Sequence, residues 1–244
     1  MTAGRRALDV QGLGVRVGRR WIVQDVSFEA RTGELVAVIG PNGAGKTTLL
    51  EAIVGLRRAS GTVRLQERPL AHFRDFAQAF AFLPDAGSLP PETTVRTLVD
   101  QACAGAPRGA RLAKLREGLT IDALLSLPIG ILSRGEHQRV ALFCTLALAR
   151  PVAVLDEPFS AFDPLQLRKV LAAVREDMGG DTSIVASIHQ IADAQAIADR
   201  ILILAEGRMV AFGDLASLRA RAGGAAASLE DVFVSLLQEA PLAS

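Results

Sequence analysis

One short segment of the sequence brings together residue types that can bind phosphate. It reads Gly40-Pro41-Asn42-Gly43-Ala44-Gly45-Lys46-Thr47-Thr48, and five apolar residues precede it. Glycines let the backbone approach an anion closely, so that several N–H groups can point at it. Strand, glycine-rich loop, lysine and helix come in the order of a P-loop, in which Lys46 would reach the β- and γ-phosphates and the Thr47 hydroxyl would contact Mg²⁺. The alternative, a glycine-rich turn before an ordinary helix, explains less of the pattern.

A pair of carboxylates follows a second apolar run. The run covers residues 152–155, and Asp156 and Glu157 come directly after it. Ligands collect at the carboxyl ends of the strands of a parallel sheet, so Asp156 is expected beside the phosphate loop, where it would hold Mg²⁺ through water. Glu157 would then polarise a water molecule for attack on the γ-phosphate, because phosphoryl transfer depends mainly on positioning and charge neutralisation. Taken alone, the pair could equally be a solvated strand end.

A third segment begins a helix with a capping motif. Ser133 is followed three residues later by Glu136, with Arg134 and Gly135 between them, and this is the spacing of a capping box. A well-capped helix is a sufficient explanation of the pattern. The start of a capped helix near a glycine is also an anion site. Since the chain already has one phosphate loop, a second such site predicts contact with a nucleotide bound by a partner.

The composition limits the class of protein. The chain has 244 residues, half of them hydrophobic, so it can bury a sizeable core. A formal charge of only +1 argues against nucleic acid as a partner, because proteins that bind it carry a basic surplus. Two cysteines without metal-type spacing fit a reducing cytosol. The most apolar stretch, 140–155, is interrupted by Arg150-Pro151 and is too short to span a bilayer. A membrane role would therefore require docking on another protein's helices.

The spacing of apolar residues predicts elements in an order typical of an α/β protein. The predicted strands are 8–10, 14–17, 22–28, 62–65, 79–83, 152–155, 183–187, 201–205 and 209–212. The predicted helices are 48–54, 92–104, 110–118, 121–126, 136–149, 165–178, 190–198 and 228–239. Because strands lie on both sides of a run of helices, we expect an α/β core with a helical insert at residues 86–150.

The order of the motifs resembles that of an ATP-binding cassette (ABC) protein over residues 8–213. Besides the three segments above, Ser160-Ala161-Phe162-Asp163 corresponds to the D-loop of that family and His189 to its switch histidine. The resemblance implies a P-loop NTPase with a RecA-like core, an N-terminal antiparallel β subdomain and an inserted α-helical subdomain. In this single domain, 1–244, the core with the β subdomain would be 7–85 and 151–222, the helical subdomain 86–150, and the tail 223–244.

The resemblance also implies partners and a mechanism. Two copies, or one copy and a paralogous cassette, would form a head-to-tail dimer around two ATP molecules with Mg²⁺, each P-loop facing the Ser133–Gly135 segment of the other chain. His189 would contact the γ-phosphate and link it to Glu157. Hydrolysis would power an integral-membrane permease subunit, contacted through residues 85–99, at the cytoplasmic face of a bacterial inner membrane.

Three positions depart from the family pattern. Asp85 stands where a glutamine usually ligates Mg²⁺; a carboxylate can also bind this hard cation, and a turn or N-cap role is the alternative. Val17 stands where an aromatic ring usually stacks on adenine, and Trp21 could substitute or belong to the core.

Arg134 replaces a glycine, and together with the segment 228–233 it resembles the branch that serves drug, antibiotic and polysaccharide exporters, which predicts an exporter. A degenerate or regulatory cassette that binds ATP without driving transport is the alternative.

Overall fold

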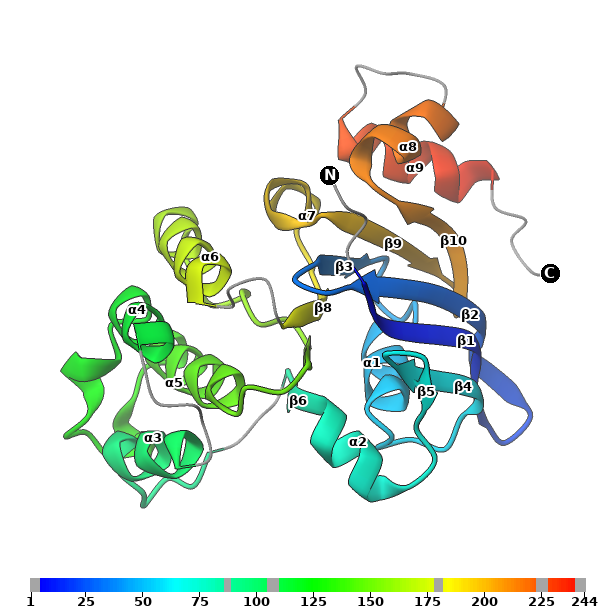
Figure 1. Ribbon diagram of the computed structural model, residues 1–244. Coiled ribbons are helices and arrows are strands. Elements are labelled where there is room, and N and C mark those ends of the chain that lie inside the picture. Colours follow the sequence, from blue (N-terminus) through cyan, green and yellow to red (C-terminus); the bar gives the residue numbers. More distant parts are fainter. Residues whose placement is uncertain (1–4, 86–88, 105–109, 178–181, 223–227, 240–244) are drawn as a thin grey trace.

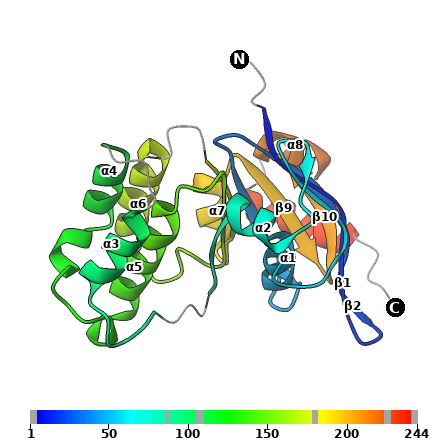
Figure 2. The same ribbon diagram turned by 60° about the horizontal axis from the view of Figure 1, so that its bottom comes forward.

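The computed structural model describes residues 5–85, 89–104, 110–177, 182–222 and 228–239. These residues form two β-sheets and a set of helices, arranged in two lobes (Figure 1). One lobe contains both sheets and the other consists of helices, and a view from a second direction shows the same division (Figure 2). The chain therefore has the predicted α/β character, with a separate helical part.

The larger sheet is built mainly from parallel strands. Its strands are β3 (Leu35–Ile39), β6 (Phe80–Leu83), β7 (Val152–Leu155), β8 (Ser183–Ser187), β9 (Arg200–Ala205) and β10 (Arg208–Gly213). They lie in the order β10-β9-β3-β8-β7-β6, and only β10 pairs antiparallel with its neighbour. The strands predicted at 152–155 and 183–187 are confirmed with the same bounds.

Both faces of this sheet are covered. Every residue of β3, β7 and β8 is buried, as expected for parallel strands that pack on both sides. Successive side chains of a strand point to opposite faces. In β3, Val36 and Val38 accordingly join one hydrophobic cluster, whereas Leu35, Ala37 and Ile39 join the other. Packing on both faces thus fixes the central strands and the positions of their carboxyl ends.

The smaller sheet is antiparallel. Its strands are β1 (Arg6–Val17), β2 (Arg20–Arg31), β4 (Ser60–Leu65) and β5 (Arg68–Pro69), in the order β2-β1-β4-β5. The prediction of two separate strands at 8–10 and 14–17 is wrong, because β1 runs through both. The polar Gln11 and Gly12, with a φ of 59° at Gly12, interrupt the apolar pattern and shift the register without ending the strand.

Nine α-helices lie among the described residues. They are α1 (Lys46–Ile53), α2 (Phe73–Ala79), α3 (Val95–Cys103), α4 (Ala110–Gly118), α5 (Arg134–Ala147), α6 (Pro164–Asp177), α7 (Ile191–Ile197), α8 (Leu215–Arg221) and α9 (Leu229–Glu239). The predicted helix 121–126 is instead a 3₁₀ turn over Ile121–Leu124. The sequence did not predict α2 or α8, because each has one buried residue, Ala79 and Leu218, and so shows no apolar stripe.

The helical lobe contains α3, α4, α5 and α6 (Figure 1). α4 and α6 pack closely, since a Cβ added to Gly118 would lie only 2.4 Å from the Cβ of Ala173. α6 thus belongs to the helical lobe although the sequence assigned it to the core, and the division of the chain at residues 86 and 150 stays a prediction. None of the helices in the described ranges is both long and apolar enough to cross a membrane.

The turn between β9 and β10 and the strand β2, both distant in sequence, support the loop between β3 and α1. The Gly207 N–H, in the turn between β9 and β10, donates to the Ala44 carbonyl at 3.0 Å, and the Gly207 carbonyl accepts from the Gln24 N–H of β2 at 2.7 Å. The Ile22 carbonyl faces two glycines: an added Cβ would lie 2.3 Å from it at Gly207 and 2.7 Å at Gly45. The φ angles of these glycines are 77° and 99°. Only glycine fits both positions, because the space and the backbone conformation exclude a side chain.

We predict that Gly207→Ala lowers the free energy of unfolding by about 2–5 kcal/mol, the sum of a left-handed backbone penalty and an overpacking penalty. Gly18→Ala is the matched control, because its φ is 60° and an added Cβ would meet nothing within 4 Å. This control should lose only about 1–2 kcal/mol. Urea unfolding of both variants measures the difference, and equal losses would show that the contact with Ile22 does not constrain Gly207.

Candidate nucleotide-binding site

The loop Gly40–Gly45 leads from the buried strand β3 directly into α1. No side chain caps α1, whose N-cap residue is Gly45, and Thr47 is exposed in its first turn. The first N–H groups of a helix lack intrahelical acceptors and carry the positive end of the helix dipole. An uncapped helix start behind a glycine-rich loop is therefore suited to bind an anion.

The lysine at the start of this helix is folded back onto the loop. Lys46 is only 8% exposed, and its Nζ donates to the carbonyl oxygens of Gly40 and Pro41 at 2.8 and 3.2 Å. Burial lowers the pKa of Lys46, and the negative charges of Glu157 and Asp156 oppose that shift. The ammonium group thus lies between the loop and the acid pair, where it can exchange carbonyl oxygens for phosphate oxygens.

Asp156 is a buried carboxylate with one oxygen left unpaired. It is 1% exposed, and its Oδ1 accepts a hydrogen bond from the Ser187 hydroxyl at 2.5 Å. Its Oδ2 is buried and has no hydrogen-bond partner among the described residues. Leaving a buried charged oxygen unpaired is costly, so this atom fits the role of a cation ligand. Mg²⁺ prefers such oxygen ligands and completes its shell with water and phosphate.

Ser187 also positions the second carboxylate. The Glu157 N–H donates to the Ser187 hydroxyl at 2.8 Å, and the Glu157 backbone has a φ of 47°, a conformation that turns the chain sharply after β7. From the other side, the Gln138 side chain donates to the carbonyl of Pro158 at 3.2 Å. Because Gln138 belongs to α5, this bond links the acid pair to the helical lobe. His189, two residues beyond Ser187, is exposed.

The predicted cap of α5 is confirmed. The Ser133 hydroxyl accepts from the Glu136 N–H at 3.3 Å, and the Ser133 N–H donates to the Glu136 carboxylate at 2.9 Å. The Ser133 hydrogen bonds lower the pKa of Glu136. Ser133 and Arg134 are exposed, and Gly135 faces the D-loop, where an added Cβ would lie 3.4 Å from the Ala161 carbonyl. The start of α5 is therefore accessible to a second molecule.

A cavity of about 500 Å³ lies beside the start of α5. Asp85 and Arg134 both line it, together with Leu89, Pro91, Ile129, Gly130, Leu132, His137, Gln138 and Ser160. The described residues contain no group of three His, Cys, Asp or Glu side chains that could hold a metal, so Asp85 does not join Asp156 and Glu157 in such a group. Its role as a metal ligand stays a prediction.

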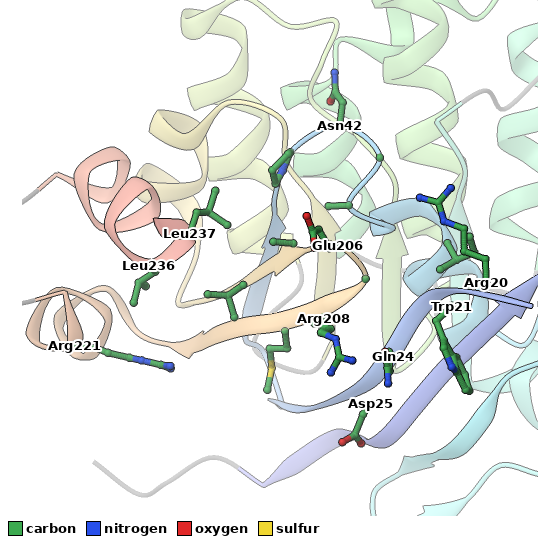
Figure 3. Close-up of a pocket in the computed structure, with 18 residues that line it drawn as sticks. Arg20, Trp21, Gln24, Asp25, Asn42, Glu206, Arg208, Arg221, Leu236 and Leu237 are labelled. Atoms are coloured by element: carbon green, nitrogen blue, oxygen red, sulfur yellow. The ribbon is translucent and has the colours of Figure 1, made fainter. Parts of the chain in front are cut away.

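A larger cavity, of about 1070 Å³, is lined in part by residues of the phosphate loop (Figure 3). Pro41, Asn42, Gly43 and Ala44 form one wall, and Arg20 and Trp21 of β2 form another. No residue lines both cavities. Of these two cavities, the phosphate loop therefore lines one through Pro41–Ala44, and the start of α5 lines the other through Arg134.

Comparison with known proteins identifies the family. The family model described as ABC transporter matches residues 23–160. The chain belongs to the ABC transporter family. It is similar to the "Hemin import ATP-binding protein HmuV" of Streptomyces coelicolor, at 36% identity over 83% of this chain and 76% of that protein. It is also similar to the "ABC-type transporter ATP-binding protein EcsA" of Bacillus subtilis, at 28% identity over 95% of this chain and 97% of that protein.

The fold comparison agrees. A solved structure described as "Structure of ATP binding subunit of ABC transporter" superposes with a TM-score of 0.85 and 30% identity, covering 95% of this chain and 99% of that one. The predicted fold class is confirmed: a P-loop cassette with an antiparallel β subdomain and a helical subdomain. As a member of this ABC family, the chain is an ATPase that binds ATP with Mg²⁺ and couples its hydrolysis to transport.

Sequence reasoning missed two residues of this ABC cassette. Ser187 was read only as a strand end, and Gln138 received no role. A serine at the end of a buried strand is a usable signal, because a fully buried hydroxyl needs a hydrogen-bond partner. No such signal exists for Gln138, since a polar residue in the first turns of a helix is usually exposed.

We predict that Ser187→Ala lowers the free energy of unfolding by about 1–3 kcal/mol and also lowers kcat for ATP hydrolysis, because Asp156 loses its only side-chain partner among the described residues. Ser183→Ala is the matched control. Ser183 lies on the same strand, is equally buried and donates to the Arg31 carbonyl at 2.8 Å, away from the acid pair. Under conditions in which both variants are fully folded, steady-state ATPase assays should show a normal kcat for the Ser183→Ala control. Normal kcat for both variants would contradict the positioning role of Ser187.

Proposed function

We propose that this chain powers a membrane permease by binding and hydrolysing ATP between the loop Gly40–Thr48 and the acid pair. The observation that carries the proposal is the unpaired, buried Oδ2 of Asp156 next to a lysine held by the loop's own carbonyls. Lys46 would bind the β- and γ-phosphates, Thr47 and Asp156 would hold Mg²⁺, and the remaining loop residues would donate backbone N–H groups. Glu157 would orient the attacking water, and His189 would contact the γ-phosphate.

The proposed assembly is a head-to-tail dimer, of two copies or of one copy and a paralogous cassette. Exposure of Ser133 and Arg134 at a capped helix start supports it. Within one chain Arg134 borders a different cavity from the one that the phosphate loop lines, so each nucleotide would be completed by a second chain. Arg134 would add positive charge near the γ-phosphate, and Gly135 would allow close approach of the backbone.

The proposed docking surface for the permease is the segment 85–99 and the cavity beside it. The lining supports this, because Leu89, Pro91 and Ile129 are apolar and Asp85, Arg134 and His137 are polar. An amphipathic cytoplasmic helix of a permease would match such a lining. Docking there would place the chain peripherally at the cytoplasmic face of the membrane, where Gln138 could pass motion from α5 to the acid pair.

The direction of transport belongs to this proposal as well. Arg134 and the segment 228–233 predicted an exporter, but the names of several similar proteins indicate import. Several are named hemin import proteins, and one from Halobacterium salinarum, at 34% identity over 83% of this chain and 54% of that protein, is named a cobalamin import protein. We infer that import is the better-supported direction.

We predict that Glu157→Gln lowers the ATP hydrolysis rate by about 10²–10⁴-fold while ATP still drives dimer formation, because the amide keeps the shape of the side chain but not its charge. Phosphate release measures the first effect and light scattering with ATP the second. Glu67→Gln is the control, since Glu67 is exposed in the turn between β4 and β5. Retained turnover in Glu157→Gln would remove Glu157 from the proposed role.

We also predict the outcome of a transport experiment. The chain would be purified with its native membrane partner and reconstituted in liposomes with the cassette outside, and hemin would be preloaded as the probe. Import corresponds to ATP-dependent release from the lumen to the cassette side. Uptake of hemin into the lumen on addition of ATP would contradict import and restore the exporter assignment.

A further inference from the structure

Positive charge is concentrated in one segment of the sheet lobe. Residues 56–78 contain five arginines and two acidic residues, whereas the whole chain carries a formal charge of only +1. The segment runs from the end of α1 through β4 and β5 to α2. This part of a nearly neutral molecule is therefore suited to attract an anionic partner.

Two of these five arginines are neutralised within the fold. Arg57 pairs with a glutamate of α1, and Arg64 pairs with an aspartate of β1 at 3.3 Å. Arg58 and Arg74 are exposed, and neither makes an ion pair or a hydrogen bond with another residue in the part of the chain that the structure describes. Their charges are therefore available to a second molecule.

The acidic residue next to Arg74 is engaged in capping its own helix. The Asp75 carboxylate accepts from the N–H groups of His72 and Ala71 at 3.1 and 3.3 Å. These bonds lower the pKa of Asp75, with smaller contributions from the charges of His72 and Arg68. Because the charge of Arg68 reaches Asp75, this exposed arginine of β5 lies near the first turn of α2. Arg68 and Arg74 thus belong to the same surface.

Two large apolar side chains project from this surface. Phe73, in the first turn of α2, is 77% exposed, and Leu56, just after α1, is 59% exposed. Phe76 joins the two elements, since a Cβ added to Gly55 would lie 2.8 Å from its ring. Residues three apart lie on the same side of a helix, so Phe73 projects from the side of α2 that faces the end of α1. Phe and Leu bordered by unpaired arginines are typical of surfaces at a membrane interface.

The place of this surface in the fold indicates what it meets. α2 is followed by β6, which ends just before Asp85 and the proposed docking segment 85–99. α2 and α3 both lie at the lower side of Figure 1, and both come forward in Figure 2. A permease docked at that segment spans the bilayer, so the neighbouring surface would be directed at the membrane.

We propose that this surface binds the anionic headgroups of a phospholipid bilayer. The basic surface consists of Leu56, Arg58, Arg68, Phe73 and Arg74. Its orientation rests on the proposed docking of a permease, whereas its lipid chemistry rests on its own charges and exposed apolar groups. Anionic leaflets attract basic side chains, and guanidinium groups form bidentate hydrogen bonds with phosphate. The apolar side chains leave water among the headgroups, and the cassette gains a second attachment that reinforces the first.

Sedimentation of the full chain with vesicles tests the proposal without a permease. Vesicles of equal parts phosphatidylglycerol and phosphatidylcholine should bind the chain at low salt. High salt should release it, because exposed charges are screened, and phosphatidylcholine alone should not bind it. Arg58→Gln with Arg74→Gln should weaken binding about 10–30-fold, since each arginine near an anionic surface contributes about fivefold.

The matched control for this double variant is Arg168→Gln with Lys169→Gln. Both residues are exposed on α6, which lies away from α2 in Figures 1 and 2. The control removes the same charge and should bind anionic vesicles as the unmodified chain does.

The apolar contact is tested separately. Phe73→Trp in the Trp21→Phe background gives a chain with a single tryptophan on α2, because the sequence has only one. Its emission should shift to the blue on addition of anionic vesicles, since the indole leaves water. Phe73→Ser should weaken binding about tenfold, the scale of burying part of a large apolar side chain. Val234→Ser is the control, because Val234 is 52% exposed on α9, and it should bind normally.

The other outcomes overturn the proposal. Absence of binding to anionic vesicles at low salt, or equal binding to neutral vesicles, would remove the lipid contact. Undiminished binding by the Arg58 and Arg74 double variant, or unshifted emission of bound Phe73→Trp, would place the contact elsewhere. Binding only to vesicles that carry the permease would assign the surface to protein. Lys46→Ala separates this inference from the proposed function, because it should lose ATP affinity and still bind vesicles.

Discussion

A hydrogen bond between two buried side chains, Ser187 and Asp156, is the interaction on which the site depends. It joins the ends of two adjacent strands, β8 and β7, at 2.5 Å. The same serine hydroxyl accepts from the Glu157 N–H, so one group orients both acids. A fully buried carboxylate with a single partner would be unfavourable in a purely structural core. The arrangement is understandable as a site that a cation and a nucleotide complete, with stability given up for function.

The phosphate loop depends on a second set of contacts, made entirely by backbone atoms. Gly207 is hydrogen-bonded to Ala44 on one side and to Gln24 on the other, so segments far apart in the sequence meet behind the loop. The position of the phosphate loop thus follows from this packing.

The two lobes carry complementary halves of the proposed chemistry. The sheet lobe holds the phosphate loop and the acid pair, and the helical lobe holds the capped start of α5. Gln138 connects them through the Pro158 carbonyl. When a nucleotide bridges two chains, its free energy of binding can act on this connection and on the cavity beside it. Such coupling would convert ATP binding into movement of the helical lobe relative to the sheets.

Sequence reasoning recovered the parts that local patterns encode. The P-loop, the capping box of α5 and the buried strands at 152–155 and 183–187 need only residue types and spacing. It failed where long-range packing decides. β1 continues through Gly12 because β2 and β4 pair with it on either side, which no periodicity reveals. The role of Ser187 depends on the order of strands in the sheet, which brings it next to Asp156 across 31 residues of chain.

A crystal structure of the chain with Mg²⁺ and a slowly hydrolysed ATP analogue tests the central claim most directly. The account predicts the β- and γ-phosphates in the loop Gly40–Thr48, Mg²⁺ held through water by Asp156, and Ser133 of a second copy against the γ-phosphate. Phosphates bound away from that loop, or an assembly in which Ser133 of no neighbouring chain reaches them, would contradict it.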